Sequence, residues 1–83
     1  MYRLAPGVQW SVEARGLLVK GAGGKVQFLE YPEAAVWDLI SRGYRFDKVV
    51  SMVSCIASID QDAGRKLVAE SLDKWVNSGL LVR

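Results

Sequence analysis

Apolar and polar residues alternate along the first part of the chain, which is the pattern of half-buried β-strands. The alternation is clearest in residues 8–13, VQWSVE, where Val, Trp and Val occupy every second position. Residues 17–20 and 25–30 are two further strand-like segments, separated by Gly-Ala-Gly-Gly, whose glycines permit the positive φ angles of a tight turn. The pattern predicts a three-stranded antiparallel β-meander, with residues 1–7 as a lead-in.

The rest of the chain has the periodicity of amphipathic helices. Three helices are predicted, over residues 32–41, 46–57 and 61–77. Pro32 suits the first position of the first helix, where its missing N–H would have no partner. Asp60 can cap the third helix with its carboxylate. The apolar residues 80–82 are expected to pack back onto the domain.

The sequence therefore predicts an α+β, winged-helix-like fold, in which a three-stranded antiparallel β-meander precedes three α-helices. With 51% hydrophobic residues and three tryptophans, residues 1–83 can form a single domain whose core needs no disulfide or metal. Cys55 is the single cysteine, and its apolar neighbours predict a buried side chain. The lone cysteine, the lack of a signal-peptide pattern and the lack of an apolar stretch of ~18–20 residues predict a soluble cytoplasmic protein.

The composition leaves few routes to catalysis. The chain has no histidine and one cysteine, which excludes His-dependent triads and the common zinc ligand sets. Its carboxylates are dispersed, and helix capping accounts for the nearest pair, Asp60 and Asp62. Residues 21–24 lack the Lys-Ser/Thr of a phosphate-binding loop. We therefore expect a binding protein that is not an enzyme and needs no metal or cofactor.

Three segments resemble the PqqD family, named for coenzyme PQQ biosynthesis, whose members are also called RiPP recognition elements. They are GLLV at 16–19, FLEYPEAAVWDLISRG at 28–43 and LDKWVNSGLL at 72–81, so the resemblance covers nearly the whole chain. The opening PGVQWSVEARGLLV is also similar to the mycofactocin-system chaperone, a relative with the same architecture. The resemblance implies a peptide chaperone. Such a protein binds the leader of a ribosomally synthesised precursor peptide and delivers it to a modifying enzyme, often a radical SAM protein.

The resemblance also implies where the leader would bind: as an antiparallel strand added to the third strand, in a cleft against the third helix. The unpaired backbone groups of an edge strand can accept a peptide in this way. The residues predicted to bind the peptide are Lys25, Val26, Gln27, Phe28 and Leu29 in the strand, and Arg65, Lys66, Ala69, Leu72 and Asp73 in the helix. Arg65 and Lys66 would meet an acidic leader and Leu72 would offer an apolar floor. Taken alone, the two basic residues are more typical of a solvated helix face.

Two other functions stay open at this point. A winged-helix DNA-binding domain would place the third helix in the major groove. Asp60 and Asp62 oppose the approach of phosphates there, and the net charge of +2 is scattered without a basic run. A structural module could instead form a homodimer by pairing its third strand with that of a second copy. The expected partners are thus a precursor peptide and its modifying enzyme, with no nucleic acid or membrane, and self-pairing as an alternative.

Overall fold

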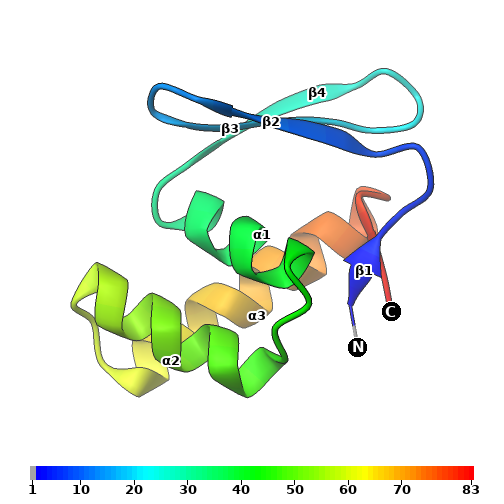
Figure 1. The fold of residues 1–83 in the computed structure, drawn as a ribbon. Coiled ribbons are helices and arrows are strands. Elements are labelled where there is room, and N and C mark those ends of the chain that lie inside the picture. The colour runs from blue at the N-terminus through cyan, green and yellow to red at the C-terminus, as the bar shows by residue number, and fades with distance from the viewer. Residues whose placement is uncertain (1) are drawn as a thin grey trace.

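The computed structural model describes residues 2–83 and contains the predicted three-stranded sheet (Figure 1). Strands β2 (Gln9–Glu13), β3 (Gly16–Lys20) and β4 (Val26–Glu30) pair antiparallel in the order β2-β3-β4. The turn between β3 and β4 includes Gly24 at a φ of 88°, a left-handed conformation that glycine adopts without steric cost. The predicted meander is therefore confirmed.

A second, two-stranded sheet joins the two ends of the described chain. Strand β1 (Arg3–Leu4) pairs antiparallel with β5 (Leu81–Val82). The prediction that the apolar residues 80–82 pack back is confirmed. The prediction of an unstructured lead-in over residues 1–7 is wrong for Arg3–Leu4, which form strand β1. Residue 1 lies outside the described residues. Two residues are too few to show a period, and the partner of β1 is at the other end of the sequence, so no local pattern revealed this strand.

Three helices follow the sheet, as predicted: α1 (Glu33–Ser41), α2 (Phe46–Ala57) and α3 (Gln61–Asn77). In Figure 1 the sheet lies over α1, and α2 lies on the side of α1 away from the sheet. The Asp60 carboxylate caps α3 by accepting a hydrogen bond from the N–H of Ala63 at 2.7 Å. Pro32 is the N-cap of α1 rather than its first helical residue. Within residues 2–83, no helix is long and apolar enough to cross a membrane.

The core lies between the helices and the inner face of the three-stranded sheet. At its centre Trp37 and Trp75 are fully buried. Their rings meet edge to face, with centroids 5.2 Å apart and an interplanar angle of 87°, a favourable geometry for two aromatic quadrupoles. Because α1 follows β4 after only two residues, this pair also fixes the position of α3 relative to β4.

Helices cover only part of the sheet. Helix α1 packs on β4, and Leu17, Val19 and Leu29 are buried on this inner face. Val12 shares a row with Leu17 and Leu29 but is 76% exposed, because the helical layer lies under β4 and not under β2. The half-buried position predicted for Val12 is therefore wrong. The outer face of the sheet exposes Leu18, Val26 and Phe28.

Cys55 is exposed on α2, so the prediction of a buried thiol is also wrong. The apolar neighbours that suggested burial include Val50 and Val53, which do form the buried face of α2. At 100° per residue, Cys55 falls on the other side of the helix from these two valines.

Candidate functional site

Strand β4 has one open edge. Strand β3 pairs with it on one side, and no strand within residues 2–83 pairs with it on the other. In an antiparallel pair, successive residues direct their backbone groups alternately toward and away from the partner strand. The N–H of Gly21 donates to the C=O of Lys25 at 2.9 Å, so Lys25 and Gln27 face β3. The open edge therefore carries the N–H and C=O groups of Val26, Phe28 and Glu30.

The side chains of β4 alternate between the two faces of the sheet. Leu29 is buried in the core and Gln27 is half-buried on the same side. Val26 and Phe28 are 54% and 45% exposed on the outer side. An extended peptide added to the open edge would therefore place alternate side chains toward the helices and toward solvent.

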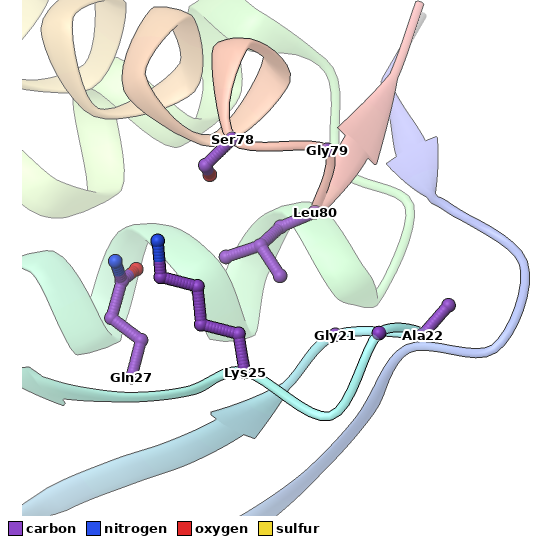
Figure 2. Close-up of a pocket in the computed structure, with 8 residues that line it drawn as sticks. Gly21, Ala22, Lys25, Gln27, Ser78, Gly79 and Leu80 are labelled. Carbon is purple, nitrogen blue, oxygen red and sulfur yellow. The ribbon is translucent and has the colours of Figure 1, made fainter.

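A pocket of about 320 Å³ lies at the start of β4, between this strand and the end of α3 (Figure 2). Lys25 and Gln27 project into it from the strand side, and Ser78 and Leu80 border it from the other side. The rest of its lining is Gly21, Ala22, Gly23 and Gly79. The Oε1 atom of Gln27 is buried and accepts no hydrogen bond from the described residues. The Gln27 amide therefore lacks a partner for its oxygen, and an occupant of the pocket could supply one once the amide turns toward it.

A second hollow, of about 210 Å³, lies beyond the end of β4, between α1 and α3. Glu33 borders it from α1, and the Nζ atom of Lys74 on α3 donates to the Oε2 atom of Glu33 at 3.1 Å. Its other lining residues are Leu67, Glu70 and Ser71. The two hollows share no lining residue, and one lies at each end of β4. We use the name β4–α3 groove for these two hollows together with the open edge of β4 between them.

The helix wall of the groove is one stripe of α3. Leu67, Ser71 and Lys74 line the second hollow, and Ser78 lines the pocket at the start of β4. These positions are spaced three or four residues apart, which places them on one side of a helix. The stripe borders the buried face that contains Val68, and Ser71 is itself one of the buried residues of α3.

The strand residues and the helix residues predicted from sequence are brought together only in part. Lys25 and Gln27 line the groove, whereas the predicted α3 residues line neither hollow. Arg65 instead faces α2, where its Nη2 atom is 3.4 Å from the Oδ1 atom of Asp47 and its guanidinium lies 5.4 Å from the ring centroid of Phe46.

The other predicted α3 residues lie elsewhere on the helix. Lys66 and Asp73 are exposed, Ala69 is half-buried, and Asp73 pairs with Arg83 at 3.1 Å. Leu72 is fully buried, so its side chain belongs to the core and offers no accessible floor. Sequence reasoning missed the stripe of Leu67, Ser71, Lys74 and Ser78. The helical period places these residues at the border of the buried side of α3. No local pattern shows which of the two borders lies near the hollows.

The groove presents binding groups rather than reactive ones. Its polar groups are backbone N–H and C=O groups, one buried amide oxygen, and lysine and glutamate side chains. Within residues 2–83, no cluster of acidic or cysteine side chains could hold a metal ion. This set of groups can recognise an extended peptide through its backbone and read its side chains at alternate positions.

Comparison with known proteins identifies the fold. No protein-family model and no curated protein matches this chain. Two solved structures do match it. TbiB1 in complex with the TbiA(beta) leader peptide superposes with a TM-score of 0.89 at 18% identity, over 95% of this chain and 93% of that chain. A lasso peptide synthetase B1 complexed with the leader peptide gives a TM-score of 0.90 at 13% identity, over 99% and 98%.

These matches confirm the fold expected from the sequence. The chain has the α+β, PqqD-like fold of the two leader-bound proteins over nearly its full length. At 13% and 18% identity, the likeness is one of fold.

Proposed function

We propose that this protein is a recognition element for the leader segment of a ribosomally synthesised precursor peptide. The leader adds to the open edge of β4 as an antiparallel strand and lies in the β4–α3 groove. The observation that carries this proposal is the free edge of β4, where Val26, Phe28 and Glu30 have no paired strand within residues 2–83. Lys25 and Gln27 of the same strand line the pocket beside this edge. Support comes from the two proteins of the same fold, whose structures contain a bound leader peptide.

The geometry separates affinity from specificity. Backbone hydrogen bonds to the edge of β4 supply affinity for any extended segment, because they depend little on sequence. The stripe of Leu67, Ser71, Lys74 and Ser78, with Lys25 and Gln27 opposite, would select the side chains that face the helices. An added strand must offset the cost of ordering a disordered peptide. We therefore expect micromolar affinity, about −8 kcal/mol.

The wider function follows from the same proposal. As a single domain of residues 1–83 acting in the cytoplasm, the protein would hold the leader and present the rest of the precursor to a modifying enzyme, of the radical SAM or another class. It would not itself catalyse a reaction. DNA binding is less well supported, because the guanidinium of Arg65 is engaged by Asp47 and Phe46, and Asp60 and Asp62 occupy the helix end that would meet phosphates.

The proposal is tested by backbone-amide NMR of the labelled protein titrated with leader peptides encoded beside its gene. We expect the largest shifts at Val26, Phe28 and Glu30, whose N–H groups face the open edge, and along the stripe of α3. A leader with N-methylated backbone at alternate residues is the control, because it keeps every side chain but loses donors to the strand. The absence of shifts with any neighbouring leader, or shifts confined to α2, would overturn the proposal.

A further inference from the structure

The two ends of the β4–α3 groove carry opposite charges. At the start of β4, Lys25 lines the pocket, and Lys20 lies opposite Val26 on β3. At the end of β4, Glu30 lies on the open edge, and Glu70 lines the second hollow. All four side chains are exposed, and none forms an ion pair within residues 2–83. Lys25 and Glu70 line the hollows, whereas Lys20 and Glu30 share the outer side of the sheet with Val26. The first pair can act on the residues of an added strand that face the helices, and the second pair on those that face outward.

Among the other charges nearby, exposed Lys66 lies four residues before Glu70 on α3 and offsets part of its charge, so Glu30 is the main acidic group at that end. Glu33 and Lys74 neutralise each other in their 3.1 Å ion pair. Glu13 shares the cross-strand row of Glu30, with Arg15 in the adjoining turn, so this pair adds no net charge. The C-terminus of α3 borders the pocket and contributes roughly half a negative charge, which is smaller than the two positive charges of Lys20 and Lys25.

The direction of an added strand decides which end of the peptide meets the acidic end of the groove and which meets the basic end. Antiparallel pairing is the stronger arrangement per residue, and it is the arrangement of every strand pair in this structure. A strand added antiparallel to β4 begins beside Glu30 and ends beside Lys25. Five residues of strand span about 17 Å, which exceeds the Debye length of ~8 Å at physiological salt, so each end acts on its own part of the peptide.

We propose, resting on the function proposed above, that the groove selects leader segments by the order of their charges. The preferred segment carries basic residues before its strand-forming centre and acidic residues after it. A peptide of the same composition with the two ends exchanged places like charges together at both ends of the groove. The protein would thus distinguish two peptides that do not differ in net charge, length or apolar content.

Two synthetic peptides test this inference. Both share one β-prone central segment and are acetylated and amidated, so that their termini carry no charge. One has Lys-Lys before the segment and Glu-Glu after it, and the other has these pairs exchanged. By fluorescence anisotropy at ~0.1 M salt, where the Debye length of ~10 Å is still shorter than the strand, we expect the basic-first peptide to bind about tenfold more tightly. The ratio of the two affinities should shrink toward one as salt rises.

A charge-exchange variant identifies the residues responsible. In Lys25→Glu with Glu30→Lys, the preference should weaken or reverse, because the net charge of the protein is kept while the ends of the groove are exchanged. The matched control is Lys48→Glu with Asp62→Lys, which makes the same exchange at exposed positions of α2 and the first turn of α3 that line neither hollow and form no ion pair within residues 2–83. It should keep the wild-type preference.

Each outcome of this experiment has one meaning. Equal binding of the two peptides, or tighter binding of the acidic-first peptide, would overturn the charge-order inference and leave strand addition standing. An unaltered preference in the Lys25→Glu, Glu30→Lys variant would also overturn it. Failure of both peptides to bind the wild-type protein would overturn the inference together with the proposed function.

Discussion

Gln27 and Phe28 are consecutive residues of β4, but they direct their backbone N–H groups to opposite edges of the strand. The hydrogen bond from the N–H of Gly21 to the C=O of Lys25 sets this alternation. Gln27 pairs with Val19 on β3, whereas Phe28 faces the open edge. Proline, which has no N–H, should therefore have different effects at the two positions.

Phe28→Pro is expected to weaken leader binding and change the stability of the fold only slightly. The substitution removes a donor that an added strand would use, and one such hydrogen bond is worth about 1 kcal/mol, or about fivefold in affinity. Gln27→Pro is expected to lower the free energy of unfolding by roughly 1–3 kcal/mol, because it removes a hydrogen bond from the ladder between β3 and β4 and leaves its acceptor unpaired. Urea denaturation and peptide titration of both variants separate the two effects.

The control for the loss of the aromatic ring is Phe28→Val, which keeps the N–H at the open edge and a β-branched side chain suited to a strand. It should bind the leader more tightly than Phe28→Pro. Equal losses of affinity in Phe28→Val and Phe28→Pro would mean that the side chain, and not the strand edge, makes the contact.

Substitution of the Gln27 side chain is expected to affect stability and leader binding in opposite directions. Its Oε1 atom is buried without a partner in the free protein, and such an acceptor costs roughly 1–3 kcal/mol. Gln27→Met should therefore leave the melting temperature unchanged or raise it. It should also reduce leader affinity about fivefold, because the occupant loses its acceptor. Gln27→Glu, which keeps an acceptor, is the comparison; an affinity unchanged in Gln27→Met would show that the leader does not use Oε1.

Much of the fold was predictable because short-range sequence patterns determine its strands and helices. The meander follows from period-two alternation and glycine turns, and α2 and α3 have the predicted bounds because their periodicity is strong and Asp60 marks the start of α3. The β-strand half of the candidate site was expected from the resemblance to the PqqD family, and the meander pattern supplied the bounds of that strand. Lys25 and Gln27 lie in the groove because the strand that contains them is at the edge of its sheet.

The helix half of the candidate site depends on tertiary packing. Periodicity shows which residues of α3 are buried, but both flanks of that buried face are polar in sequence. The flank of Leu67 and Lys74 turns toward the start of α1, which follows β4, because the Trp37–Trp75 contact and the Glu33–Lys74 ion pair join α3 to α1. The opposite flank carries Arg65 and turns toward α2. No local signal distinguishes the two flanks.

The exposure of Cys55 leads to a simple chemical prediction. A thiol on the solvent side of α2 should react with Ellman's reagent in the folded protein, with one thiol titrated per chain and no denaturant. Cys55→Ser is the control for background reaction and should fold with the same stability, because its side chain is not part of the core. A thiol that reacts only after urea is added would show that this face of α2 is covered in solution.

Helices α2 and α3 approach each other closely where Gly64 lies against Ser54. A Cβ atom placed on Gly64 would overlap the Oγ atom of Ser54 and would lie 3.1 Å from its Cβ atom and 3.5 Å from the C=O of Val50. Gly64→Ala should therefore lower the free energy of unfolding by roughly 1–3 kcal/mol, as over-packing of a close contact does. Gly23→Ala is the matched control, because a Cβ atom at Gly23 meets nothing within 4 Å.

The same contact predicts coupling between the two residues. The Oγ atom of Ser54 is buried and has no hydrogen-bond partner within residues 2–83, so Ser54→Ala alone should be close to neutral or stabilising. With that oxygen removed, Gly64→Ala should cost less than it does in the wild-type protein, because the strongest overlap is gone. A double-mutant cycle by urea denaturation measures the difference. Costs that add within about 0.5 kcal/mol would mean that the helices shift apart and that the Ser54 oxygen does not limit their approach.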